Sequence, residues 1–455
     1  MRHSWLLLLM VLAAGACREE DGPLGGSGSG VLVVESDPSG ARILIDGESI
    51  GRVTPDTVRD LVGLRNVVAQ LDTGGVRYGY SAQVVVTGTE PVVLNGPLMA
   101  RCQGQATSCA GDFRREHTVG TLRFSTNALG ALFLQQGQGG GLYWPGTSQN
   151  VYLSTGMPMF AAMSGSQPVA LGIYDTEFLA GRPAPVAGTR AGGYQVTQKT
   201  WILPPLAMTA LAVARGIEVS QRVLAPPDQD GLMLIELVFR NITDQPLYRK
   251  VDPGMSAGGV AFSDAYVGLA LDPDIGGADD DWLSYDETLN AVFAYDADFA
   301  EGGFSTQQNA PALLGLRLLR APAGAQAVLN GWVNEVQSSF DWRAGNASQA
   351  AGYGMLSGEA SYVPDHPGDL VGHLPSAPGD VRISVTAGPL QLAPGDSAKL
   401  VLGLALAVPT PGSYASGQQV QPGPPDQPTR PLYAIAAHLR ERLIATGALL
   451  SRLDP

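Results

Sequence analysis

The chain has 455 residues, of which 45% are hydrophobic and 15% charged, and its 42 acidic side chains against 28 basic ones give a formal net charge of −14. This length and composition predict a folded protein with two or three domains. A nucleic-acid partner is excluded, because phosphate binding needs clustered Lys and Arg, which the sequence does not contain.

The N-terminal segment, residues 1–17, has the order of a secretory signal peptide. A basic start is followed by an apolar run from Trp5 to Ala14, too short to span a bilayer, and by small residues before Cys17. The site Ala14-Gly15-Ala16-Cys17 resembles the lipobox of bacterial lipoproteins, with Ala14 at the position where that family usually has Leu. The resemblance implies a lipid on Cys17 and an address in the bacterial cell envelope, anchored in a membrane and facing the periplasm or the cell surface. An ordinary cleaved signal is the alternative.

Two further features fit an exported protein. Residues 18–30, REEDGPLGGSGSG, are typical of a flexible tether. With Cys17 assigned to the lipid, Cys102 and Cys109 remain as a pair, and in an oxidising compartment such a pair favours a disulfide over two free thiols.

Residues 31–98 predict a small all-β domain. Short β-branched runs such as VLVVES, ARILIDG and SAQVVVTG alternate with Gly, Pro, Asp and Asn, the residues of turns. The region resembles the PEGA domain at Ser36-Asp37-Pro38-Ser39-Gly40-Ala41, Ile45-Asp46-Gly47, Gly51, Thr54-Pro55, Leu61 and Gly63. It departs from that family at Ser39, often Glu, and at Arg65, usually His. The resemblance implies a small sandwich that serves as a spacer or interaction module.

Residues 111–408 predict a large antiparallel β-sandwich region, either one sandwich or a pair of packed sandwiches. Strand-like runs such as GLMLIELVFRNITD and PALLGLRLLRA follow one another, and no long amphipathic helix interrupts them. Residues 390–408 predict a closing hairpin that turns at Pro394-Gly395-Asp396. The region resembles uncharacterised secreted or surface proteins of bacteria at Gly141-Leu142-Tyr143-Trp144-Pro145-Gly146, Asn241-Ile242-Thr243-Asp244 and Asp272-Pro273-Asp274-Ile275-Gly276.

The C-terminal part changes character. Residues 409–429 form a Pro/Gly-rich connector, and residues 430–453 place Leu432, Ile435, Leu439 and Leu443 at helical spacing. In a chain that is otherwise predicted to be mostly β, this pattern predicts one amphipathic helix. Its apolar stripe docks on the sandwich or on a partner.

The acid-rich stretch LDPDIGGADDDWLSYD, residues 271–286, is the candidate metal site. Calcium binds six to eight oxygens, and carboxylates at alternate positions converge on one ion. The candidate ligands are Asp272, Asp274, Asp279, Asp280, Asp281 and Asp286. The EF-hand register fails, because Gly276 and Leu283 occupy two ligand positions. A solvated turn is the alternative to calcium.

The sequence contains no H-E-x-x-H, Walker or dinucleotide motif, which favours a protein without catalytic activity. We therefore expect a cell-envelope lipoprotein that binds an envelope protein or polysaccharide, or that has a structural role. The alternative is a secreted carbohydrate-active or other hydrolytic enzyme. It would use two of the carboxylates, about 5 to 9.5 Å apart, with exposed Trp144 or Trp282 as a sugar platform.

Overall fold

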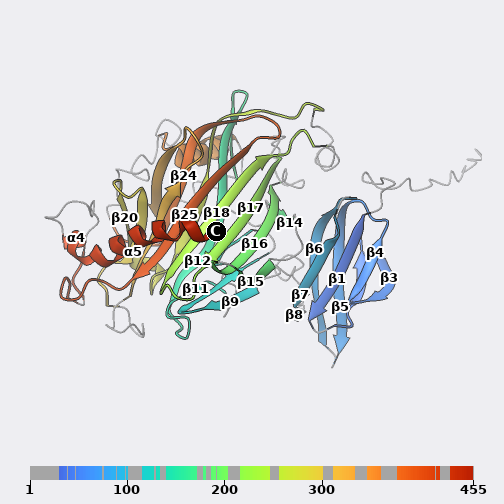
Figure 1. The fold of residues 1–455 in the computed structure, drawn as a ribbon, viewed down its shortest axis with the longest axis horizontal. Coiled ribbons are helices and arrows are strands. Elements are labelled where there is room, and N and C mark those ends of the chain that lie inside the picture. Colours follow the sequence, from blue (N-terminus) through green and yellow to red (C-terminus); the bar gives the residue numbers. More distant parts are fainter. Residues whose placement is uncertain are drawn as a thin grey trace, which may run out of the picture.

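The computed structural model describes the chain in segments. These are residues 30–37, 39–46, 48–73, 76–88, 90–97, 99–100, 115–127, 130–133, 140–171, 178–180, 186–190, 192–202, 216–245, 256–300, 311–333, 346–359, 377–415, 417–420 and 431–453. The predictions for Cys17, Cys102, Cys109 and the tether at 18–29 lie outside them. The prediction of a mostly β chain is confirmed, and two β assemblies are seen in Figure 1.

The N-terminal assembly is a small sandwich of two sheets. Its strands are β1 (Val31–Asp37), β2 (Arg42–Ile45), β3 (Glu48–Val53), β4 (Asp56–Arg59), β5 (Gly63–Thr73), β6 (Val76–Val86), β7 (Val92–Pro97) and β8 (Met99–Ala100). One sheet has the order β4-β1-β7, and the other runs β6-β5-β2-β3 with β8 beside β6. Alternate residues of the strands, among them Leu32, Val34, Ile43 and Val67, are fully buried between the sheets.

The motif residues of this assembly hold its turns together. The amide of Ala41 donates to Thr54 Oγ1 at 3.0 Å, and the backbones of Gly40 and Ala41 bond that of Thr54. Arg65, which stands where the PEGA family usually has histidine, lies 3.2 Å from Asp46 in the β2–β3 turn. These contacts are mechanical, because each one fixes a chain reversal.

The body consists of two large antiparallel sheets. The eight-stranded sheet contains β9 (Arg115–Val119), β10 (Leu122–Thr126), β11 (Leu142–Tyr143), β12 (Val151–Ser164), β13 (Gln167–Leu171), β19 (Phe262–Pro273), β23 (Gln326–Val333) and β24 (Val381–Leu392). The facing sheet contains β14 (Phe178–Ala180), β15 (Val186–Arg190), β16 (Gly193–Ile202), β17 (Ile217–Ala225), β18 (Leu232–Asn241), β20 (Asp281–Asp286), β21 (Ala291–Asp296), β22 (Leu313–Arg320) and β25 (Ser397–Ala407). Through β14 the facing sheet also pairs with β6, at Ala180 and Val84.

Strand β25 shows why strands of the facing sheet have nearly continuous apolar sequences. Leu400, Leu402 and Leu404 enter the core between the sheets. The alternate residues Val401 and Ala405 enter a second core on the outer face. Because successive side chains point to opposite faces, a strand covered on both sides is apolar at every position.

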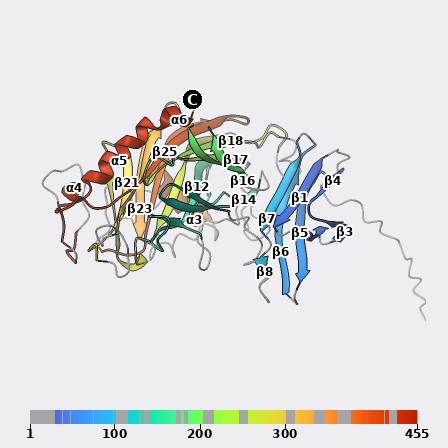
Figure 2. The same cartoon turned by 60° about the horizontal axis from the view of Figure 1, so that its bottom comes forward.

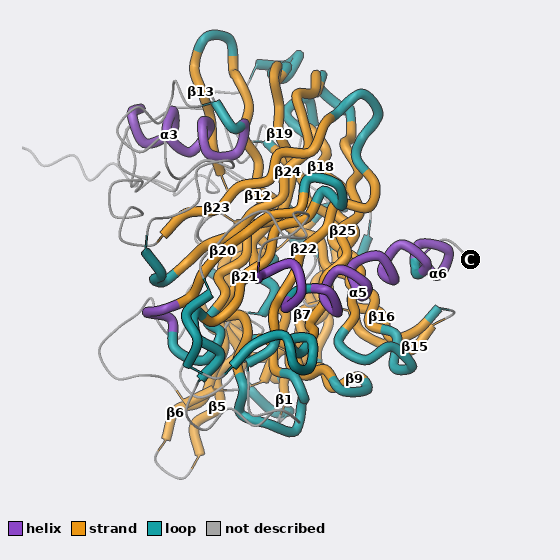
Figure 3. Tube along the Cα trace, turned by 90° about the vertical axis from the view of Figure 1, so that its left-hand side faces the viewer, coloured by secondary structure: helices purple, strands orange, loops and turns teal. Residues whose placement is uncertain are grey.

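The C-terminal helices provide that outer cover. They are α4 (Pro431–Ile435), α5 (Ala437–Ala448) and α6 (Leu450–Leu453), in place of the single helix predicted over 430–453. The apolar stripe predicted from their spacing is buried against the facing sheet, so docking on the sandwich is confirmed. Helix α5 crosses β22 and β25, as Figure 3 shows, and a Cβ at Gly315 would lie 2.9 Å from Leu443. Among the described residues, no helix is long and apolar enough to cross a membrane.

One prediction about the body is wrong, and one short helix was not predicted. Residues 390–408 do not form a hairpin, because β24 pairs with β19 and β23 in one sheet while β25 pairs with β18 and β22 in the other. The turn at Pro394 therefore crosses between sheets. A helix, α3 (Asn346–Ser357), also interrupts the strands. It lies on the outer face of the eight-stranded sheet, opposite α5 (Figure 2), where Thr386 Oγ1 donates to Leu356 O at 2.6 Å.

Candidate functional site

The acid-rich stretch at 271–286 carries the chain from one sheet of the body to the other. Its first residues end β19, and its last six form β20. Only residues 274–280, which include the short 3₁₀ helix η2 (Ala278–Asp280), form a connection. The six predicted ligands are therefore distributed over two sheets and the segment between them.

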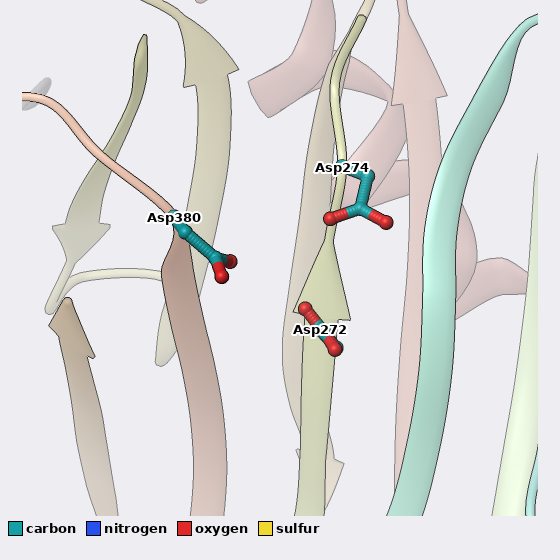
Figure 4. A group of neighbouring side chains, drawn as sticks. All are labelled: Asp272, Asp274 and Asp380. Carbon is teal, nitrogen blue, oxygen red and sulfur yellow. The ribbon is translucent and has the colours of Figure 1, made fainter. Parts of the chain in front are cut away.

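The first acidic group lies at the end of β19. One carboxylate oxygen from each of Asp272, Asp274 and Asp380 lies within 4.8 Å of the others. Figure 4 shows Asp380, just before β24, directed toward the end of β19, where Asp272 and Asp274 lie. Burial raises the pKa of Asp272 to about 7, although the neighbouring guanidinium of Arg382 acts to lower it.

Arg382 gives this first group a cation of its own. Its Nη1 lies 2.5 Å from Asp272 Oδ1 and also contacts the carboxylate of Asp380. Burial likewise raises the pKa of Asp274, and Arg382 opposes that shift. The positive charge that three neighbouring carboxylates need is thus supplied, at least in part, by the protein itself.

The second acidic group lies where η2 meets the end of β21. Asp280, Asp296 and Asp298 each bring a carboxylate oxygen within 4.8 Å of the others. The Asp296 side chain is fully buried, and its Oδ1 accepts from the amide of Asp298 at 3.1 Å. Asp298 Oδ1 in turn accepts from the amide of Ala300 at 2.9 Å. These backbone hydrogen bonds fix the positions of the Asp296 and Asp298 carboxylates.

Asp281 connects the second group to the interior. It is fully buried, and it stands directly opposite Asp296 in the β20–β21 ladder, so both side chains lie on the same face of the sheet. Its Oδ2 accepts from the amide of Ile275 at 3.0 Å, whereas Oδ1 has no hydrogen-bond partner among the described residues. Burial raises the pKa of Asp281 well above the usual range, and the charge of Asp296 raises it further.

The two remaining predicted ligands, Asp279 and Asp286, belong to neither acidic group. Asp279 is exposed on η2. Asp286 is 1% exposed, and its Oδ2 lies 2.8 Å from Arg440 Nε on helix α5. Of the six predicted ligands, Asp272 and Asp274 join one acidic group, Asp280 joins another, and Asp281 lies beside the second.

The sequence prediction did not include three members of these groups. Asp380 lies more than a hundred positions beyond Asp272 in the sequence, and only the β19–β24 pairing brings the two together. Asp296 ends β21 and Asp298 lies two residues beyond it, and the hairpin from β20 to β21 returns both to Asp280. The phrase AYDADFA, with two aspartates just after a strand, is the one local signal that could have indicated them.

The sugar platform of the enzymatic alternative is not exposed. Trp144 has 8% of its surface accessible and Trp282 has 4%. Trp144 instead donates from Nε1 to Asp230 Oδ1 at 2.7 Å. Neither indole presents an open face on which a sugar could stack.

Comparison with known families gives one match. Residues 29–99 match the family model described as the PEGA domain, in agreement with the motif residues of the N-terminal sandwich. Because this match covers a minor part of the chain, it assigns the N-terminal sandwich alone. A comparison with curated proteins gave no match.

Several solved structures align with the chain at low identity and low TM-score. A polysaccharide lyase is 14% identical over 55% of this chain and 25% of its own, with a TM-score of 0.24. A putative aldose 1-epimerase from Escherichia coli K12 is 10% identical over 64% of this chain and 99% of its own, with a TM-score of 0.29. A heparan sulfate lyase from Pedobacter heparinus is 10% identical over 79% of this chain and 36% of its own, with a TM-score of 0.25. The chain thus spans a quarter of the first lyase, and TM-scores this low carry no inference about function.

Proposed function

We propose that this protein is a lipoprotein of the bacterial cell envelope, whose sandwich body has a binding or structural role and is stabilised by a calcium ion. The observation that carries the cation is the geometry around Asp281. A fully buried carboxylate with one unpartnered oxygen stands beside the group formed by Asp280, Asp296 and Asp298. A divalent ion is the partner that such a concentration of acid favours.

The second acidic group suits calcium better than the first. Calcium is a hard cation that takes oxygen ligands in flexible geometry, and three carboxylates supply half of the usual number. In the first group Arg382 already contacts two of the three acids. In the second, the backbone amides around Asp296 and Asp298 fix two carboxylates while leaving them further oxygen lone pairs.

Thermal melting with calcium and then with a chelator tests the cation. Binding to the folded state alone raises the free energy of unfolding by about 2.7 kcal/mol when calcium is a hundredfold above its dissociation constant. We expect Asp298→Asn to abolish the shift, because it removes a carboxylate while keeping the side-chain shape. Asp279→Asn, at an exposed position next to the group, is the matched control and should keep the full shift. The absence of a shift at millimolar calcium would remove the ion from the proposal.

The anchor rests on the sequence. The signal-like residues 1–17 end on Cys17, the tether follows, and the first described strand begins at Val31. A lipid at Cys17 would hold the N-terminal sandwich near a membrane and leave the body free to meet an envelope protein or polysaccharide. We expect the wild-type protein in the membrane fraction and Cys17→Ala in the soluble fraction. A Cys17→Ala protein that stays with the membranes contradicts the anchor.

Burial favours binding over hydrolysis. Asp281 and Asp296 face each other in the β20–β21 ladder, and both are fully buried. A glycosidase needs its two acids on either side of a bond in a bound sugar, which a buried pair cannot reach. The hydrolytic alternative thus has no observation in its favour at this group.

A further inference from the structure

A pocket that includes no member of the acidic groups lies where α5 meets the turns of the sandwich. Its volume is about 400 Å³, and its wall includes Thr121, Trp144, Asp230, His438, Glu441 and Arg442. These residues come from the β9–β10 turn, the segment after β11, the β17–β18 turn and α5. A volume of this size is within the range of small-molecule sites, about 300–1,000 Å³.

Asp230 is fixed on one side of the pocket. Its Oδ1 accepts from Trp144 Nε1 at 2.7 Å and from the hydroxyl of Thr121. The next residue, Gly231, has a φ of 59°, and a Cβ there would lie 3.1 Å from Arg442 Nη2 and 3.2 Å from Trp144 Nε1. The turn is therefore shaped so that both side chains approach its backbone closely.

Arg442 lies across from this turn on α5, and its charge is only partly compensated. Its side chain is 28% exposed, and Nη2 lies 4.0 Å from Asp230 Oδ2, beyond hydrogen-bond distance. Nε and Nη2 are both buried without a hydrogen-bond partner among the described residues. Burial lowers the pKa of Arg442, and Asp230 acts in the opposite direction.

A ligand carboxylate would complete this arrangement. The guanidinium fork matches a carboxylate in two parallel hydrogen bonds, and such charge-assisted bonds are stronger than those between neutral groups. A bare anion does not account for the rest of the wall, since Asp230 and Glu441 would repel it. Hydroxyl groups on the same ligand would remove that conflict, because they donate to carboxylates.

We propose that this pocket binds a sugar acid, with the ligand carboxylate on Arg442 and ligand hydroxyls donating to Asp230 and Glu441. The imidazole of His438 and the hydroxyl of Thr121 line the same wall and offer further hydrogen bonds. The inference names a ligand class for the binding role proposed above. It does not depend on the calcium ion, because no member of the acidic groups lines the pocket.

Isothermal titration of the full chain with D-galacturonate and D-galactose tests the pocket. The two sugars differ in the carboxylate, so galacturonate should bind and galactose should bind at least about tenfold more weakly. Arg442→Gln should weaken galacturonate binding at least about tenfold, and Arg442→Lys should weaken it as well, because it keeps the charge but loses the fork. Arg52→Gln is the matched control, since that exposed arginine pairs with Asp56 in the N-terminal sandwich, and it should leave binding unchanged.

Two arms make the result decisive. Titrations repeated with a chelator should give the same affinity, which separates this site from the calcium proposal. Titration with trigalacturonate distinguishes a site for a free sugar acid from a site for a polysaccharide. A polysaccharide site would bind the trimer more tightly than the monomer. The proposal is overturned if galacturonate does not bind, if galactose binds as tightly, or if both Arg442 variants, shown to be folded by circular dichroism, bind like the wild type.

Discussion

The N-terminal sandwich and the body are both built from two β-sheets, but they differ in where their charged side chains lie. Those described in the N-terminal sandwich are at least partly exposed, whereas the body buries several. In the N-terminal sandwich, the Arg65–Asp46 pair is 25% and 42% exposed, and the described buried polar residues, Thr54 and Gln70, are uncharged. In the body, Asp281 and Asp296 are fully buried, and Asp286 meets Arg440 at 1% and 20% exposure. Buried charge is costly unless it is paired or functional, so the buried acids make the body the better candidate for a functional site.

The largest expected effect comes from removing one partner of the pair between β20 and α5. Arg440→Ala leaves Asp286 buried and without the cation that contacts it directly, and we expect the free energy of unfolding to fall by about 3 kcal/mol. The loss lies at the lower end of the range for buried pairs, because Asp286 Oδ1 still accepts from Thr288 Oγ1 at 2.6 Å and from the amide of Leu289 at 3.2 Å. Denaturant unfolding measures it.

The control for this change lies in the other sandwich. Arg65→Ala removes an exposed pair of the same chemistry and should lower the free energy of unfolding by less than about 1 kcal/mol. Equal losses in the two variants would mean that the exposure of the pairs does not distinguish the two regions.

The second prediction concerns pH and His117, a residue type that residues 31–98 do not contain. Its ring contacts Tyr194 Oη at 2.9 Å and Thr126 Oγ1 at 2.8 Å. Burial, with Arg115 adding to it, lowers the pKa of His117 from 6.5 to about 4. Between these values the unfolded chain binds the proton more readily, so the stability present above pH 6.5 is lost as the pH falls.

The size of this loss follows from the two pKa values. Between pH 7.5 and pH 5 it amounts to about 2 kcal/mol. The raised pKa of Asp272 acts with the opposite sign over part of this range, because there the folded state holds the proton. The wild type and His117→Gln share that contribution, so the difference between them isolates His117. Parallel pH dependences in the two proteins would show that the histidine does not titrate as its burial implies.

How much of this contrast the sequence could predict depends on how local each feature is. The turn motifs of the N-terminal sandwich lie within a few residues of one another, so Thr54, Asp46 and Gly40 could be interpreted directly. The apolar stripe of the C-terminal helices is also local, and it predicted their docking. The break at Ala436 and Leu449 was not visible, because alanine and leucine favour continued helix.

The acidic groups could not be predicted from spacing alone. Asp272 and Asp280 are close in sequence, but β19 and β20 belong to different sheets, so they join different groups. The hairpin expected at Pro394 failed for a related reason, since a turn motif does not say which sheet the next strand will join. Helix α3 was missed because alanine and glycine fill NASQAAGYGMLS without an amphipathic pattern.

The smallest predicted effect tests the mechanical role of the N-terminal motif. Thr54 is 3% exposed, and its Oγ1 accepts from the amide of Ala41 and contacts the hydroxyl of Ser36. Thr54→Val keeps the shape but leaves the buried amide without its acceptor, at a cost of about 1 to 2 kcal/mol. Hydrogen exchange resolves the effect by region: peptides from residues 31–97 should exchange roughly tenfold faster, and those from the body should not change. Ser49→Ala, in the same sandwich but exposed, should leave both regions as they are. Faster exchange in the body of the Thr54 variant would mean that the two sandwiches unfold together, so that the N-terminal one is part of the body's stability and not an independent spacer.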